Sequence, residues 1–194
     1  GEPLGATETA LAKQALGWAA EPTFLVPDEV RAVFAAHADA NRKLHESWKQ
    51  KLTAWRQADP ARSELWDAHW EKKAPADLAK HLLAAVEGHT AATRALSGMV
   101  LNKAAELIPA LAGGSADLEP SNNSRIKASA SVQKGEFAGR NLHFGIREHA
   151  MAAIVNGMAI YAAWLPYGAT VLVFSDYMRP SLRLAALMDL RVAQ

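Results

Sequence analysis

The chain has 194 residues, of which half are apolar and 21% charged, a composition that excludes a disordered or fibrous protein. Lysine and arginine exceed the acidic residues by only one, 21 against 20, and form no cluster, so we expect no nucleic-acid partner. The absence of cysteine excludes disulfides and thiolate metal sites, and no apolar run reaches the roughly 18 residues of a spanning helix, so we expect a cytoplasmic protein without membrane contact.

The first part of the chain predicts helices joined by an extended segment. Residues 7–16 are rich in Ala and Leu and predict a short helix with Thr7 as its N-cap. Residues 21–27 contain two prolines and are expected to be extended. A long helix is predicted to follow, with Asp28 as its N-cap.

An apolar stripe runs along this long helix at steps of three or four residues and contains Leu44, Trp48, Leu52 and Trp55. Trp66 and Trp70 repeat the four-residue spacing further along the chain. Residues with this spacing share one helix face, so we interpret the stripe as a helix-packing surface rather than a cofactor site.

A break in the helical pattern at residues 73–76, Lys-Ala-Pro-Ala, precedes an Ala- and Leu-rich helix predicted at 77–86. We place a domain boundary here, which divides the chain into residues 1–75 and 76–194.

The second region alternates helices with short apolar strands, as is typical of a parallel α/β sheet. The predicted helices cover residues 90–108, 147–163 and 175–190, the strands cover 110–114 and 167–174, and a long loop covers 118–139. Ligands of open α/β sheets bind at the carboxyl ends of the strands. We therefore expect Asp117, Ser121 and Tyr177 to lie at that edge.

One carboxylate, that of Glu148, lies where a turn containing Gly145 meets the predicted start of a helix. By itself, an acidic residue in a first turn stabilises a helix by a few tenths to about 1 kcal/mol. The surrounding residues 143–151, His-Phe-Gly-Ile-Arg-Glu-His-Ala-Met, resemble a hallmark of transketolases. Residues 113–122, Gly-Gly-Ser-Ala-Asp-Leu-Glu-Pro-Ser-Asn, resemble a second segment of the same family. The similarity extends over essentially the whole chain.

The resemblance implies an incomplete α/β fold, namely the parallel-sheet thiamine-diphosphate-binding fold, preceded by a helical linker region. Residues 1–75 would be the C-terminal end of the pyrophosphate-binding domain plus the linker, and 76–194 the first part of the pyrimidine-binding domain. The chain has no initiating methionine and stops after an apolar helical pattern, so we expect a piece of a longer protein. Mg²⁺ (or Ca²⁺) would be bound by the part of the parent protein that is missing here.

The resemblance also implies residue roles around thiamine diphosphate. Glu148 would be the catalytic residue: hydrogen-bonded to N1′ of the aminopyrimidine, it promotes the imino tautomer that removes the C2 proton, and it should be shielded from water. Phe174 and Tyr177 would form the aromatic pocket for the pyrimidine. Val171 stands where the family often has a third aromatic residue, which leaves the pocket wider. Asp117 would help to position the thiazolium side of the cofactor near the subunit interface.

The same resemblance assigns Arg94 and Ser121 to substrate binding. An arginine offers a permanently charged, bidentate contact to a sugar phosphate, and a serine adds a neutral donor. The parent would be a homodimer with its active site at the subunit interface, and would transfer a two-carbon ketol unit between sugar phosphates in the pentose phosphate pathway. An isolated chain of this extent is expected to be inactive. His143 and His149 are unsuitably spaced for a ligand pair on one helix face, and we expect no metal site in this chain.

Two alternatives remain open. A 1-deoxy-xylulose-5-phosphate synthase-like enzyme shares a glutamate in a similar string, although the Gly-Gly-Ser-Ala-Asp-Leu and Pro-Ser-Asn combination favours transketolase. The chain could instead be a non-catalytic subunit of a split thiamine enzyme, with its aromatic helices serving as an interface.

Overall fold

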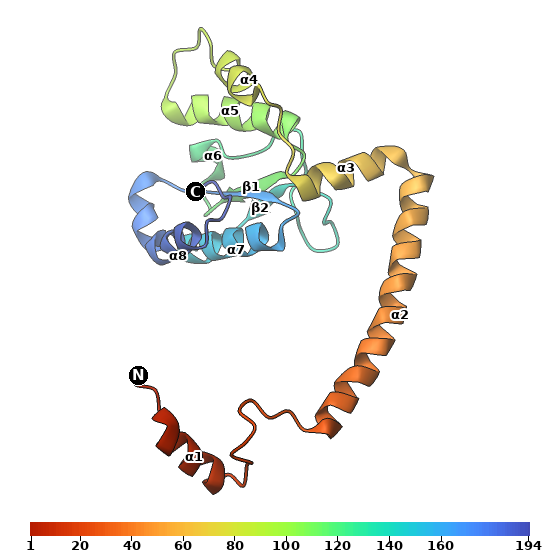
Figure 1. Ribbon diagram of the computed structural model, residues 1–194. Helices are drawn as coiled ribbons and strands as arrows, with labels where there is room; N and C mark the ends of the chain where they lie inside the picture. Colours follow the sequence, from red (N-terminus) through yellow and green to blue (C-terminus); the bar gives the residue numbers. More distant parts are fainter. The chain divides into compact units, whose positions relative to one another are not determined.

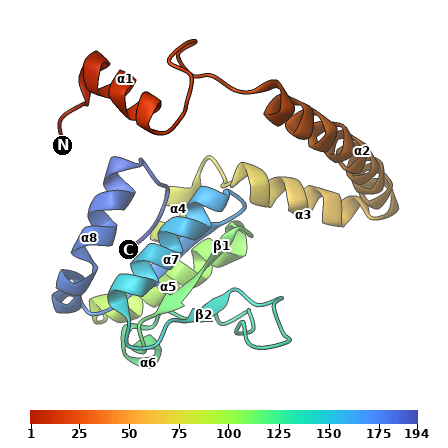
Figure 2. The same cartoon turned by 90° about the horizontal axis from the view of Figure 1, so that it is seen from below.

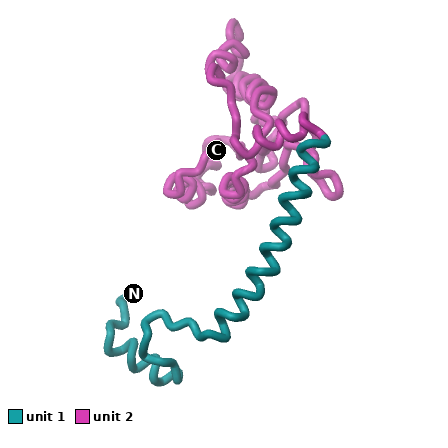
Figure 3. Tube along the Cα trace, turned by 45° about the vertical axis from the view of Figure 1, so that its right-hand side comes forward, with its two compact units in different colours: residues 1–58 teal, residues 59–194 magenta.

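Two units make up the chain in the computed structural model, which describes residues 1–194: unit 1 is Gly1–Ala58 and unit 2 is Asp59–Gln194 (Figure 3). The domain division after residue 75 concerns the domains of the parent family and stays a prediction.

Unit 1 contains two helices, α1 (Gly5–Ala15) and α2 (Asp28–Ala58), which confirms the two helices predicted there. Both N-cap predictions are wrong. Helix α1 begins before Thr7, which therefore lies inside its first turn. In α2 the carbonyl of Pro27 accepts hydrogen bonds from the N–H groups of Val30 and Arg31. Pro27 therefore occupies the N-cap position, and Asp28 is the first residue of the first turn.

The stripe on α2 is partly exposed within the described chain. Leu44 and Trp48 are exposed, and Leu52 and Trp55 are half-buried. Its role as a packing surface stays a prediction. Neither α2 nor any other helix combines the length and apolarity needed to cross a membrane.

Unit 2 is built on a parallel three-stranded sheet with the order β2-β1-β3. The strands are β1 (Leu111–Ser115), β2 (Asn141–His143) and β3 (Leu165–Ala169). Helix α5 (Thr93–Leu107) lies on one face, while α7 (Glu148–Tyr161) and α8 (Ser175–Leu187) lie on the other (Figure 1). Figure 2 shows the same layers from below. Helices α3 (Pro60–Glu71) and α4 (Leu78–Ala84) precede α5, and the short helix α6 (Glu119–Asn122) follows β1.

A separate apolar core fills the space on each face of the sheet. On the α5 face, Ala105 and Ile108 pack with Leu111 and Tyr167 of the strands. On the other face, a cluster joins α7 and α8 to the loops after β1 and β2, and consists of Ala116, Phe144, Met151, Ala152, Val155 and Met178. This α/β/α layering confirms the predicted fold class.

The central strand β1 requires glycine at two positions. A Cβ on Gly113 would lie 2.0 Å from the carbonyl oxygen of Tyr167, and one on Gly114 would lie 1.8 Å from that of Leu142. Both neighbouring strands therefore approach β1 more closely than any side chain would allow.

The strand predicted at residues 167–174 is wrong in its boundaries. Strand β3 ends at Ala169, and the chain then forms a short 3₁₀ turn, η1 (Leu172–Phe174), with the N–H of Phe174 bonded to the carbonyl of Val171 at 2.8 Å. The apolar residues that follow Ala169 lie on the surface rather than in the sheet: Leu172 is 87% exposed. On the free side of β3, Ala193 forms a parallel bridge to Tyr167.

The predicted loop at residues 118–139 is irregular apart from α6, and strand β2, which follows it, was not predicted. The loop is organised by the side chain of Asn141, which is buried. Its Oδ1 accepts from the N–H of Ile126 at 2.8 Å, and its Nδ2 donates to the carbonyls of Ile126 at 2.9 Å and Ser129 at 2.8 Å. The backbone of Asn141 also forms a parallel bridge to Ser131, so the side chain and the backbone of this one residue together satisfy the polar groups of the loop.

We predict that Asn141→Leu lowers the free energy of unfolding of the 194-residue chain by on the order of 3 kcal/mol, because it leaves buried backbone groups without partners. Urea denaturation followed by circular dichroism measures this loss. The matched control Asn41→Leu, at an exposed position of α2, should change stability by less than about 0.5 kcal/mol. Equal effects of the two substitutions would contradict the assigned role of Asn141.

Candidate functional site

Glu148 is the first residue of α7, and its side chain is buried, with 8% of the residue exposed. The shielding from water predicted for this residue is thus confirmed. The hydroxyl of Thr170, directly after β3, donates to Oε1 of Glu148 at 3.4 Å. A carboxylate can accept about four hydrogen bonds. Glu148 therefore retains acceptor capacity in a buried place at the positive end of a helix.

The turn before α7 places this carboxylate. Gly145 has a φ of +67°, and the N–H of Arg147 donates to the carbonyl of Gly145 at 2.8 Å. Phe144, immediately before the turn, is buried in the core between α7 and α8. The buried side chain of Phe144 and the tight turn at Gly145 therefore together place the first turn of α7 next to the sheet.

The segment after Thr170 forms an exposed apolar surface beside the end of β3. Val171 and Tyr177 are exposed, and Phe174 is half-buried. The rings of Phe174 and Tyr177 lie 6.2 Å apart between centroids, tilted by 38°. Two of the predicted cofactor-binding residues are therefore paired, and Val171 adjoins the residue that contacts Glu148.

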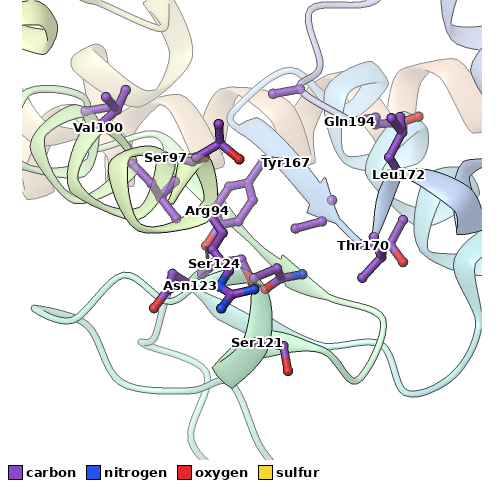
Figure 4. A pocket seen from close by; sticks show the side chains of 18 of the residues that line it. Arg94, Ser97, Val100, Ser121, Asn123, Ser124, Tyr167, Thr170, Leu172 and Gln194 are labelled. Carbon is purple, nitrogen blue, oxygen red and sulfur yellow. Dashed lines mark hydrogen bonds between the residues drawn. The ribbon is translucent and has the colours of Figure 1, made fainter. Parts of the chain in front are cut away.

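A cavity of about 780 Å³ lies between α5, α6 and the end of β3. It brings together the predicted residues Arg94, Ser121 and Val171, and Thr170 also lines it. Figure 4 shows the side chain of Arg94 extending from α5 toward the residues at the end of α6, with Thr170 across the cavity. Glu148, Phe174, Tyr177 and Asp117 are not among the lining residues.

The charged side chains that line this cavity are of one sign. Arg94 is the only Lys or Arg that lines it, and no Asp or Glu side chain does. Arg94 is exposed and forms no ion pair, whereas serines and asparagines surround the α6 end of the cavity. Such a set of donors suits an anionic group such as a phosphate.

Asp117 lies apart from this cavity. It has a φ of +63° and lines a small hollow of about 110 Å³ with Ser115, Glu119, Pro120, His143 and Gly145. An aspartate tolerates this left-handed conformation better than most residues do. The structure thus places Asp117 at the carboxyl edge of the sheet, as predicted, but in a different recess from Arg94 and Ser121.

The two histidines near Glu148 have structural partners. Nε2 of His143 lies 2.9 Å from the hydroxyl of Ser131. Nδ1 of His149 lies 3.3 Å from the hydroxyl of Ser181, which joins α7 to α8. No group of three or more His, Asp or Glu side chains in the chain is arranged to hold a metal ion.

Two residues of the site were not predicted, Thr170 and Tyr167. Tyr167 is buried, and its hydroxyl donates to the carbonyl of Ser124 at 2.7 Å. The rule that ligands gather at strand ends would have singled out Thr170, but the predicted strand ran on to Phe174 and placed Thr170 in its interior.

Burial raises the pKa of Tyr167. An unfolded tyrosine ionises near pH 10, so above that pH the folded chain binds more protons than the unfolded chain, and the stability contributed by Tyr167 falls as the pH rises. We predict that urea midpoints of the chain decrease between about pH 9 and about pH 11, and that Tyr167→Phe makes this decrease shallower. The control Tyr161→Phe removes a hydroxyl from a residue that is 68% exposed and should leave the slope unchanged. An unaltered slope in Tyr167→Phe would refute the linkage.

Comparisons with known proteins agree with one another. A family model described as the pyrimidine-binding domain of transketolase matches residues 89–194. A second, described as the thiamine-diphosphate-binding domain of transketolase, matches residues 1–75. The transketolase of Geobacillus stearothermophilus is 42% identical over 193 residues, which are 99% of this chain and 29% of that protein. That of Bacillus subtilis is 39% identical over 193 residues, with the same two shares.

Solved structures give the same result. The transketolase of Pichia stipitis in complex with sedoheptulose 7-phosphate matches with a TM-score of 0.84 and 34% identity, covering 98% of this chain and 29% of that chain. The transketolase of Leishmania mexicana matches with a TM-score of 0.82 and 34% identity, covering 98% of this chain and 28% of that one. The chain thus spans less than a third of the length of these relatives.

A parallel sheet between helical layers, with a buried glutamate at a helix start beside strand ends, defines an α/β protein with part of the thiamine-diphosphate-binding fold. The chain belongs to the transketolase family.

Proposed function

We propose that this chain is part of a thiamine-diphosphate-dependent transketolase of the pentose phosphate pathway. The enzyme would move a two-carbon ketol unit from a ketose phosphate, such as xylulose 5-phosphate, to an aldose phosphate, such as ribose 5-phosphate or erythrose 4-phosphate. The observation that carries the proposal is the buried carboxylate of Glu148, which has a single long hydrogen bond and lies within a sequence hallmark of the family.

The residues present fit a bound aminopyrimidine. Glu148 offers an acceptor that no protein group saturates, and the paired rings of Phe174 and Tyr177 offer an apolar wall beside the same strand end. When bound, thiamine diphosphate supplies the nucleophilic carbon and the electron sink of ketol transfer. Glu148 would accept a hydrogen bond from the pyrimidine and hold a proton at its N1′ atom. Val171 would leave this pocket wider than an aromatic residue, and Asp117 would contact the thiazolium side.

The cavity of Arg94 and Ser121 supports a sugar-phosphate site. A guanidinium that forms no ion pair, in a cavity without Asp or Glu side chains, can make two parallel hydrogen bonds to a phosphate, and the serine hydroxyl adds a third donor. These groups would orient the substrate and would not take part in bond making.

We place the other parts of the active site outside this chain. Mg²⁺ (or Ca²⁺) and the diphosphate would be held by other regions of the parent enzyme, which we propose to be a cytoplasmic homodimer with its active site at the subunit interface. Residues 1–75 would end the pyrophosphate-binding domain and form the linker, and residues 76–194 would begin the pyrimidine-binding domain.

In the full-length enzyme, we predict that Glu148→Gln leaves thiamine diphosphate binding within about threefold but lowers kcat by about 10² or more, because the amide keeps the shape of the side chain and cannot take up the proton. Cofactor binding is measured by tryptophan fluorescence titration, and kcat by a ketol-transfer assay. Glu87→Gln, an exposed substitution, serves as the matched control. Unchanged kcat in Glu148→Gln would eliminate the catalytic role.

For the purified 194-residue chain alone, we predict no ketol transfer, since it would lack the groups for the metal and diphosphate as well as the rest of a dimer interface. The assay uses xylulose 5-phosphate and ribose 5-phosphate with added thiamine diphosphate and Mg²⁺, and the full-length enzyme is the positive control. Measurable turnover by the short chain would overturn this prediction. Decarboxylation of pyruvate by the full-length enzyme would instead support a 1-deoxy-xylulose-5-phosphate synthase.

A further inference from the structure

Ser121, which we propose to bind phosphate, lies on a short helix that is stable only with contacts from outside the helix. Helix α6 has only 4 residues, and a single helical turn is unstable without outside support. At its start, the hydroxyl of Ser115 accepts a hydrogen bond from the N–H of Leu118 at 3.1 Å. The same hydroxyl lies 3.0 Å from the side-chain amide of Asn122 at the other end of α6. Ser115, buried at the end of β1, thus ties both ends of α6 to the sheet.

A second set of contacts ties the end of α6 to strand β3. The side-chain amide of Asn122 lies 2.7 Å from the hydroxyl of Ser124. The carbonyl of Ser124 accepts the hydrogen bond from the Tyr167 hydroxyl at 2.7 Å. Ser124 and Tyr167 are both buried. A continuous polar network therefore runs from β1 through Asn122 to β3, and Asn122, Ser124 and Tyr167 form part of the wall of the cavity that Ser121 lines.

The arginine side of the cavity is set by a close contact between α5 and α6. A Cβ on Gly98 would lie 2.8 Å from Cβ and 2.9 Å from the carbonyl oxygen of Asn123, a distance that real Cβ atoms do not reach. Gly98 is one helical turn after Arg94, so the two share a face of α5. Any side chain at position 98 would force α5, and Arg94 with it, away from the end of α6.

We propose that Ser115, Asn122, Tyr167 and Gly98 are positioning residues that fix the spacing of Arg94 and Ser121 for the phosphate of the sugar substrate. The inference rests on the proposed function of Arg94 and Ser121. It concerns residues that act through those two and not by contact with the reacting atoms. Tyr167 is the most informative member, because its buried hydroxyl donates the hydrogen bond that joins Ser124 to strand β3.

The test uses Tyr167→Phe in the full-length enzyme, with Tyr161→Phe as the matched control. The phenylalanine keeps the ring in the core but removes the hydrogen bond to Ser124. We expect KM for the phosphorylated ketose to rise about fivefold to tenfold, while kcat stays within about twofold and KM for the same ketose without its phosphate is unchanged. The control should alter none of these. A general loss of structure would instead lower kcat for both substrates without a phosphate-selective rise in KM, and that result, an equal rise of both KM values, or no rise at all overturns the proposal.

A second variant and a second readout keep the test independent of Tyr167→Phe and of ketol transfer. Gly98→Ala should produce the same phosphate-selective rise, because it separates α5 from Asn123 while leaving the tyrosine intact. In the 194-residue chain, Tyr167→Phe should accelerate amide hydrogen exchange of residues 121–124 by about fivefold or more, with Tyr161→Phe unchanged. Unaltered exchange there overturns the proposal even if the enzyme is active. Absence of ketol transfer in the full-length wild type contradicts the proposed function alone.

Discussion

A carboxylate held out of water at the start of α7 is the feature on which the site depends. Burying a charge costs several kcal/mol unless other groups compensate. The positive end of the helix offsets up to about 2 kcal/mol of this cost, and the 3.4 Å hydrogen bond from Thr170 adds little. A turn with Gly145 and a buried Phe144 nevertheless hold Glu148 in this place. Our proposal that a bound ligand donates a hydrogen bond to this carboxylate accounts for its position.

Strand β3 connects the Arg94 cavity to Glu148. Tyr167, within the strand, supports the α6 end of the Arg94 cavity, and Thr170, just after it, both lines that cavity and contacts Glu148. Because a strand is rigid and its residues alternate between faces, groups on it keep fixed distances from one another. The arrangement lets one strand set the placement of the cavity proposed to bind phosphate and of the buried Glu148 at the same time.

The predictions that held are those that depend on local pattern. Helices with strong periodicity were located within a few residues, and the motif around Glu148 indicated both the family and the burial of its glutamate. The predictions that failed depend on what a segment meets in space. The apolar pattern after Ala169 predicts a strand, although no strand lies beside it there. Strand β2 went unpredicted because its three residues, 141–143, form no apolar run.

By itself, the sequence determined the helices, the α/β class, the family and the chemical types of the candidate residues, since each of these follows from nearby side chains and their spacing. Only the tertiary structure decided which candidates share a recess. Arg94 and Ser121 line the same cavity, whereas Asp117 lines a separate one. Thr170 and Tyr167 belong to the site only because of their contacts in space. The reason is that hydrogen bonds between strands and loops far apart in the chain leave no periodic trace along it, as the bond from Tyr167 to Ser124 illustrates.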